Sequence, residues 1–191
     1  MNTEIVLASA SPRRKELLGF IFKNFINVAS EVQESVPDDM EISSIPQYLA
    51  EVKARDVAEK YPDALVIGAD TLVCLNGTAL GKPRDYKQAE EMLRMLSGKT
   101  HSVITGCALI YKGKCCRFSS VTEVEFYNLT KEEINEYINT DEPYDKAGGY
   151  GIQSYGGLFV KRINGDYYNV VGLPVAELKR QINKFLDKRD I

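Results

Sequence analysis

Short apolar segments alternate with helical patterns along the first hundred residues, and this alternation restricts the possible folds most strongly. Residues 5–8 and 64–75 are apolar runs typical of buried strands, and residues 85–96 form an amphipathic helical pattern. Two long strand-like segments, 100–111 and 114–127, then follow one another directly. The pattern predicts an α/β fold with α+β character, in which helices flank an elongated mixed sheet.

Local signals mark where these elements begin and end. Ser11 and Pro12 are typical of a helix start, and Asn76-Gly77 is typical of a hairpin turn. Thr130 and Glu133 have the spacing of a capping box. Since the sequence shows neither repeats nor linker-like stretches, residues 1–191 are expected to form one domain. Its two lobes are expected to share one core, with a central cleft between them.

Composition excludes several classes of protein. The chain has 191 residues, is 44% hydrophobic and 27% charged, and carries a net charge of −3. These values are typical of a globular protein and argue against general nucleic-acid binding, which requires a broad basic surface. The sequence has neither a bilayer-length apolar run nor a signal-peptide pattern. We therefore expect a cytoplasmic protein without a membrane partner.

The four cysteines and the single histidine offer little chemistry. Cys74, Cys107, Cys115 and Cys116 contain no C-x-x-C pair, and His101 is alone, so a zinc site is not expected. Reduced cysteines packed in strands and a structural histidine are the favoured interpretation.

The first candidate site is the turn between the first strand and the first helix. It brings together the hydroxyls of Ser9 and Ser11 and the guanidiniums of Arg13 and Arg14. Helix N-termini and arginines both favour phosphate groups. The alternative is a capped helix with two solvated arginines, but the combined residues favour a phosphate-binding turn.

The second candidate is Asp70, a carboxylate inside the apolar run 66–73. A buried charge without a partner is unfavourable by several kcal/mol, so Asp70 needs a metal ion, a cation or a position at the sheet edge. Gly68 and Ala69 are expected to leave open space beside it. A structural salt bridge is the alternative, and the open space favours function.

Other candidates are weaker when they are considered singly. Lys82 follows Gly81 in a turn, but Pro83 occupies the position where a P-loop requires Ser or Thr. Lys53 is expected on an exposed, charged helix face, and Glu34 lies in an acidic loop. Each of these is as easily explained by solvation as by function.

The glycine-rich stretch 148–157 is more specific. Its glycines allow a close approach of the backbone to a ligand, and Gln153 offers a donor and an acceptor for the edge of a base. Ser154 breaks a G-x-G-x-x-G pattern, so a dinucleotide motif is not formed. A flexible loop is the alternative interpretation.

Taken together, these segments resemble the Maf family of nucleotide pyrophosphatases, also called septum formation inhibitor proteins. The resemblance runs almost from end to end and rests on ordered motifs. These are 7–18 (Leu-Ala-Ser-x-Ser-Pro-Arg-Arg-x-x-Leu-Leu), 31–34 (Glu-Val-x-Glu), 53–55 (Lys-Ala-Arg), 68–71 (Gly-Ala-Asp-Thr), 81–83 (Gly-Lys-Pro), 96–101 (Leu-Ser-Gly-Lys-Thr-His), 145–153 (Asp-Lys-Ala-Gly-x-Tyr-Gly-Ile-Gln) and 171–174 (Val-Gly-Leu-Pro).

The resemblance implies a two-lobed fold related to that of inosine triphosphate pyrophosphatases, often in a homodimer. It also implies that a nucleoside triphosphate is hydrolysed to the monophosphate and pyrophosphate with a divalent cation, Mg²⁺ or Mn²⁺. The family's general base corresponds to Asp70. Its specificity positions correspond to Arg13, Thr71 and Gln153, and this set resembles the branch acting on dTTP and UTP.

The complete hypothesis assigns a role to each candidate. Asp70 orients the attacking water and, with Glu34, holds the metal ion. The phosphate chain binds Ser9, Arg13, Lys53 and Lys82, while Thr71 and Gln153 contact the pyrimidine. Two alternatives remain: a nucleotide-binding regulator of cell division without turnover, and a pyrophosphatase for purine or modified purine triphosphates. Modified pyrimidine nucleotides would also fit the main hypothesis.

Overall fold

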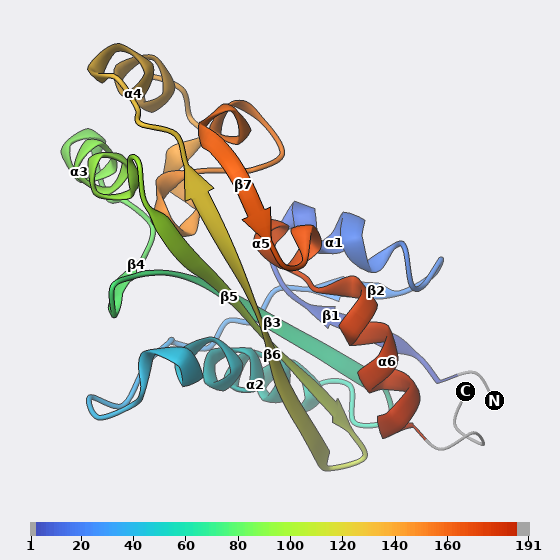
Figure 1. The fold of residues 1–191 in the computed structure, drawn as a ribbon. Helices are drawn as coiled ribbons and strands as arrows, with labels where there is room; N and C mark the ends of the chain where they lie inside the picture. The colour runs from blue at the N-terminus through green and yellow to red at the C-terminus, as the bar shows by residue number, and fades with distance from the viewer. Residues whose placement is uncertain (1–2, 187–191) are drawn as a thin grey trace. The chain divides into compact units, whose positions relative to one another are not determined.

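The computed structural model describes residues 3–186, which form one mixed sheet and the helices that pack on it (Figure 1). The strand order is β2-β1-β3-β5-β6-β7, and β4 pairs with β3. Strand β1 runs parallel to β2 and to β3, whereas β4 is antiparallel to β3 and β7 is antiparallel to β6. The expected mixed α/β sheet is confirmed. The strands are β1 (Ile5–Ala8), β2 (Ile26–Val28), β3 (Leu65–Leu75), β4 (Thr78–Leu80), β5 (Thr100–Tyr111), β6 (Lys114–Phe126) and β7 (Val160–Asn164).

The helices follow the local signals closely. The side chain of Asp85 caps α3 by accepting a hydrogen bond from the backbone N–H of Gln88. Both hydrogen bonds of the capping box at Thr130 are present at the start of α4. Residues Tyr167–Val171 form a short helix, α5. Among the described residues, no helix is long and apolar enough to cross a membrane. The α-helices are α1 (Pro12–Leu18), α2 (Ile45–Ala58), α3 (Tyr86–Leu96), α4 (Lys131–Ile138), α5 (Tyr167–Val171) and α6 (Val175–Phe185).

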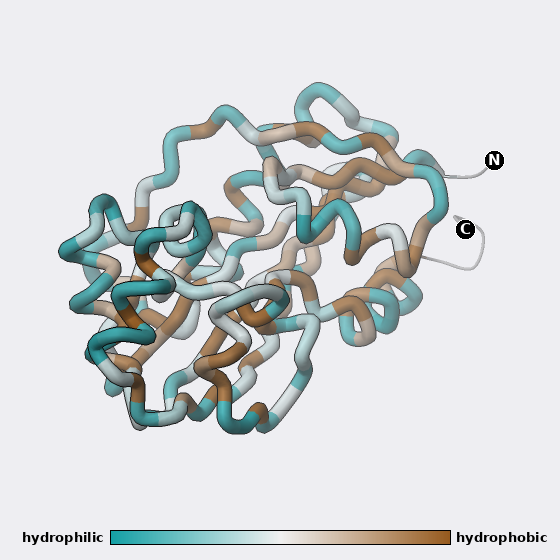
Figure 2. Tube along the Cα trace, turned by 90° about the horizontal axis from the view of Figure 1, so that it is seen from above, coloured by the Kyte–Doolittle hydropathy of each residue, from teal (hydrophilic) through white to brown (hydrophobic). Residues whose placement is uncertain are grey.

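The chain divides into two compact units, and β3, β5 and β6 each contribute residues to both. The first unit contains residues 1–70, 105–120 and 172–191. The second contains residues 71–104 and 121–171. In the tube of Figure 2, hydrophobic stretches (brown) alternate with hydrophilic stretches (teal) along the chain.

In the first unit, α2 lies directly on the sheet. A Cβ atom at Gly68 of β3 would be 2.2 Å from the carbonyl oxygen of Ala50 and 2.9 Å from the Cβ of Ala54. At Gly106 of β5 it would be 2.1 Å from the backbone nitrogen of Gln47. These distances are far below van der Waals contact, so only glycine fits at either position. The prediction of open space beside Asp70 is therefore wrong, because the backbone of α2 fills the space next to Gly68.

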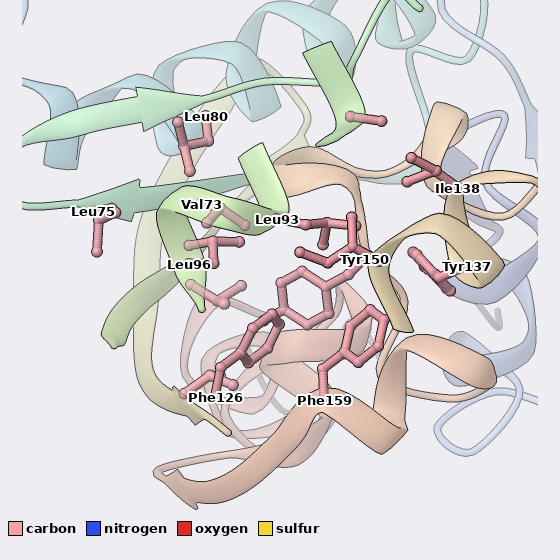
Figure 3. Close-up of a cluster of buried hydrophobic side chains, with 14 residues drawn as sticks. Val73, Leu75, Leu80, Leu93, Leu96, Phe126, Tyr137, Ile138, Tyr150 and Phe159 are labelled. Atoms are coloured by element: carbon pink, nitrogen blue, oxygen red, sulfur yellow. The ribbon is translucent and has the colours of Figure 1, made fainter. Parts of the chain in front are cut away.

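In the second unit, aromatic rings form the core beneath the glycine-rich stretch. Phe126 packs edge to face on Tyr150, with 4.7 Å between ring centroids, and on Phe159, at 5.9 Å (Figure 3). The buried His101 packs on Phe126 and shares a 2.8 Å hydrogen bond with the hydroxyl of Tyr150. Tyr137 of α4 completes the cluster against Phe159. This environment gives His101 the structural role that was expected for it.

We predict that His101 makes stability depend on pH. Burial lowers its pKa from 6.5 to about 4. Below pH 6.5 the unfolded chain therefore binds a proton that the folded chain excludes, and stability falls as the pH falls from 6.5 towards 4. Between pH 6.5 and 5 the expected loss is about 2 kcal/mol. Urea unfolding at several pH values measures this loss.

The control for this prediction is His101→Gln, which removes the only histidine of the chain. Its free energy of unfolding should change less than that of the wild type between pH 5 and 6.5. Equal pH dependence in the two proteins would show that His101 is not the titrating group.

Candidate active site

Asp70 is bound to a lysine of helix α2. The Nζ of Lys53 is 2.5 Å from Oδ1 of Asp70, and each side chain is only 15% exposed. Asp70 lies two residues beyond Gly68 on β3, so both residues face α2, since side chains alternate along a strand. Of the partners expected for this carboxylate, a metal ion, a cation or a sheet edge, the structure provides a cation.

Lys53 lies on the buried stripe of α2. Ala50, Ala54 and Val57 are buried, and Lys53 occupies the helical position between them. The predicted exposed position for Lys53 is therefore wrong, because the helical period turns it towards the sheet. The expectation fits its neighbour Arg55 instead, which is exposed and binds Glu51 at 2.7 Å.

Glu34 brings a second carboxylate to the same lysine. Its Oε1 is 3.0 Å from Nζ of Lys53, and its side chain is 49% exposed. The acidic loop that carries Glu34 is fixed to α2, because Asp56 accepts hydrogen bonds from the Ser30 hydroxyl at 2.8 Å and the Glu31 backbone at 3.0 Å. The Ser30 hydrogen bond lowers the pKa of Asp56. The structure thus brings together Glu34, Lys53 and Asp70, three residues that lie far apart in the sequence.

The turn before α1 is organised by its two serines. The buried Oγ of Ser9 accepts a hydrogen bond from the backbone N–H of Ser11 at 3.1 Å. The Oγ of Ser11 accepts one from the N–H of Arg14 and caps the helix, as predicted. Ser9 therefore shapes the turn, and its own O–H remains a donor. Arg13 follows on the first turn of the helix and is partly exposed.

Arg14 was expected in the phosphate-binding turn beside Arg13, but its contact with the last motif was not foreseen. Its Nε donates a 2.9 Å hydrogen bond to the carbonyl oxygen of Gly172. Burial lowers the pKa of Arg14, and the negative charge of Asp70 opposes this shift. The signal was present in the sequence: Arg14 shares the helical stripe of the buried Leu17 and Leu18. This hydrogen bond joins the first and last motifs of the sequence.

Thr71, Lys82 and Gln153 belong to the second unit. Thr71 directly follows Asp70 on β3, so the two side chains lie on opposite faces of the strand. Lys82 and Gln153 are exposed. The backbone N–H of Gly148 donates a 2.9 Å hydrogen bond to Gly81, which binds the segment of Lys82 to the glycine-rich stretch. That stretch forms short 3₁₀ turns at its two ends, Ala147–Gly149 and Tyr155–Phe159.

Two oxygen ligands are available for a hard divalent cation in the first unit. Glu34 and Asp70 both point a carboxylate oxygen at one nitrogen, Nζ of Lys53. Mg²⁺ commonly uses one or two carboxylates, with water and substrate phosphates as its other ligands. Within residues 3–186 no group of three or more His, Cys, Asp or Glu side chains is placed to hold a metal ion. The donor set therefore fits a metal ion whose coordination is completed by substrate, and not a preformed protein cage.

Comparisons with solved structures agree with the fold. A HAM1 protein from Coxiella burnetii superimposes with a TM-score of 0.55 and 15% identity, covering 95% of this chain and 99% of that one. The Ham1 protein of Staphylococcus aureus gives a TM-score of 0.54 at 16% identity, covering 96% and 100%. At such low identity, these similarities concern the fold alone.

Sequence comparisons identify the family. The profile of Maf-like proteins matches residues 4–185. Curated relatives named dTTP/UTP pyrophosphatase, from Bacillus cytotoxicus and Bacillus cereus, are 51% identical over 182 residues, or 95% of each chain. The resemblance drawn from the motifs is thus confirmed over nearly the whole length, and the chain belongs to the Maf family.

Proposed function

We propose that this protein is a nucleoside triphosphate pyrophosphatase that converts dTTP and UTP into the monophosphate and pyrophosphate. The relatives with 51% sequence identity are named dTTP/UTP pyrophosphatase, which supports this activity. The observation that carries the mechanism is the pairing of Asp70 and Glu34 with Lys53. It is a compact set of opposite charges beside the middle of strand β3, and the strand supplies a rigid support.

Asp70 acts as the general base. Lys53 binds Oδ1 and so fixes the orientation of the carboxylate, which leaves Oδ2 to accept a proton from the attacking water. The water oxygen attacks the α-phosphorus, the bond to the bridging oxygen breaks, and pyrophosphate leaves. Because the base is already oriented, the entropic cost of bringing water and carboxylate together is lower.

Glu34 and Asp70 would hold the divalent cation, Mg²⁺ or Mn²⁺. When bound, the ion makes water more acidic and neutralises phosphate charge, so that a carboxylate becomes an adequate base. Glu34 is half exposed and lies on a loop, so its carboxylate would be accessible to such an ion. Lys53 would donate a hydrogen bond to a phosphate oxygen.

Cationic and hydroxyl groups hold the phosphate chain. We assign this role to Ser9, Arg13, Lys53 and Lys82, whose donors stabilise the negative charge that develops as pyrophosphate leaves. Thr71 and Gln153 contact the pyrimidine. Because Asp70 and Thr71 are neighbours on β3, the residue for chemistry and the residue for recognition share one strand.

The remaining assignments follow from the same function. A cytoplasmic location matches the place where nucleoside triphosphates are made and used. We further propose that residues 1–191 act as one Maf-like domain and that the chain can form a homodimer, as the family resemblance implies.

The test is the hydrolysis of a panel of nucleoside triphosphates by the purified protein with Mg²⁺. We expect monophosphate and pyrophosphate, formed fastest from dTTP and UTP, because Gln153 and Thr71 suit a pyrimidine edge. Inosine or purine triphosphates as best substrates would point to the purine alternative. Nucleotide binding without turnover would point to the regulator and contradict the proposed enzyme.

A further inference from the structure

The loop that carries Gln153 is held at both of its ends by two side chains. On one side of Gln153, the N–H of Gly151 donates a 3.1 Å hydrogen bond to the hydroxyl of Tyr137. On the other side, the N–H groups of Tyr155 and Gly156 donate to the carboxylate of Glu142, at 3.2 Å and 3.3 Å. The loop is therefore closed by contacts that flank the glutamine by two or three residues.

The two side chains also bind each other. The hydroxyl of Tyr137 donates a 3.1 Å hydrogen bond to Oε1 of Glu142. Burial raises the pKa of Tyr137, so this proton stays on the hydroxyl across the physiological range. One carboxylate thus accepts from the tyrosine hydroxyl and from both amides, and the hydroxyl in turn accepts from Gly151.

The pair is itself fixed to the core of the second unit. Tyr137 is 4% exposed, and its ring packs edge to face on Phe159 with 4.9 Å between centroids (Figure 3). The backbone of Glu142 is bound on both sides: its N–H donates to the hydroxyl of Thr140, and its carbonyl oxygen accepts from Nζ of Lys146 at 2.8 Å. The ring of Tyr137 therefore cannot move without disturbing α4 or the aromatic core, and the backbone at Glu142 is held by its neighbours.

The close packing of the loop leads to the same conclusion. A Cβ atom at Gly151 would be 2.8 Å from Oε1 of Glu142, and one at Gly156 would be 2.9 Å from the hydroxyl oxygen of Tyr137. The loop backbone thus lies directly against the tyrosine and the glutamate. Gln153 itself remains exposed at the tip of this closed loop.

We infer that Tyr137 and Glu142 are positioning residues that fix the place of Gln153 and thereby set the preference among bases. This inference rests on the proposed role of Gln153 in contacting the pyrimidine. Selectivity through hydrogen bonds depends on placing donor and acceptor within a few tenths of an ångström. A loosened loop would still admit a nucleotide, but it would contact the wrong base nearly as well as the right one. Asp70, Lys53 and Glu34 lie outside this loop, so the chemical step is retained.

The experiment compares kcat/KM for dTTP with kcat/KM for dGTP in a double-mutant cycle of Tyr137→Phe and Gln153→Ala. Tyr137→Phe keeps the ring in the core and removes only the hydroxyl. We expect it to lower the dTTP-to-dGTP ratio by about tenfold, mainly through KM for dTTP, because one loop end is released. In the Gln153→Ala background the same change should have no further effect on the ratio.

Tyr144→Phe is the matched control. Its hydroxyl donates a 2.9 Å hydrogen bond to the carbonyl oxygen of Ile138 in α4, and its side chain packs against the same core. Removing this hydroxyl should leave the ratio unchanged. If Tyr137→Phe fails to fold, Glu142→Gln replaces it in the cycle. Glutamine has an NH₂ group in place of one carboxylate oxygen, and this group cannot accept a hydrogen bond from the loop amides of Tyr155 and Gly156.

The possible outcomes separate the inference from the function on which it rests. An unchanged ratio in Gln153→Ala alone would remove the proposed role of Gln153. A reduced ratio in Gln153→Ala, with a normal ratio in Tyr137→Phe, would overturn the positioning role and leave the proposed function intact. An equal effect of Tyr137→Phe in both backgrounds would overturn it as well.

Discussion

Replacement of Asp70 by asparagine is expected to lower kcat for dTTP by about a thousandfold, the scale of a lost general base. The amide has nearly the same shape, and its oxygen can still accept from Lys53, which keeps its ion pair with Glu34. However, the amide cannot take up the proton of the attacking water, and it lacks a negative charge for the metal ion. The fold and nucleotide binding should therefore persist. Pyrophosphate release gives kcat, and calorimetric titration with dTTP gives the affinity.

Glu51→Gln is the matched control for this variant. Glu51 also lies in the first unit, on helix α2, but its carboxylate binds Arg55 and Arg117. Its replacement should leave kcat within a few-fold of the wild type. Near-normal turnover by Asp70→Asn would exclude Asp70 as the base.

Replacement of Gly68 by alanine is expected to destabilise the protein by about 3 kcal/mol or more, as severe overpacking does. The new methyl group would be 2.2 Å from the carbonyl oxygen of Ala50, and backbone atoms cannot rotate away as a side chain can. Helix α2 must therefore shift, and Lys53 shifts with it, so activity should fall as well. Urea unfolding measures the loss.

The control is Gly81→Ala, since a Cβ at Gly81 would have no atom within 4 Å. We expect it to unfold at nearly the wild-type urea concentration. Wild-type stability in Gly68→Ala would mean that α2 can move away from β3 without cost, contrary to the packing described.

The fold could be predicted from the sequence because its signals are local. The capping box at Thr130 and the Asn76-Gly77 hairpin depend on residues a few positions apart, and both were found where expected. Asn76 and Gly77 both have positive φ, 50° and 77°, as such a two-residue hairpin turn requires. The long strands β5 and β6 were evident for the same reason, since their pattern extends over more than ten residues.

The site was only partly predictable, because its contacts join distant parts of the chain. No residue near Lys53 in the sequence indicates that Asp70 or Glu34 is its partner. The buried stripe of α2 could, however, have shown that Lys53 faces the sheet. Gly68 was misjudged because a missing side chain can mean either open space or a filled contact. Only the position of Ala50 distinguishes these cases. The contacts of Tyr137 and Glu142 with the glycine-rich stretch were likewise invisible in the sequence.

The two glycines beneath α2 have a consequence for how this protein can change over evolutionary time. Gly68 and Gly106 lie on the neighbouring strands β3 and β5, and at both the main chain of the helix touches the main chain of the sheet. Because these contacts join backbone atoms, no side chain can change its rotamer to alter the distance between α2 and the sheet. Substitutions that change the size of surrounding core residues therefore cannot alter this distance gradually. The separation of Lys53 from Asp70 is thereby insulated from ordinary mutation. Lineages can thus vary their cores and their base preference while the charged pair stays in place.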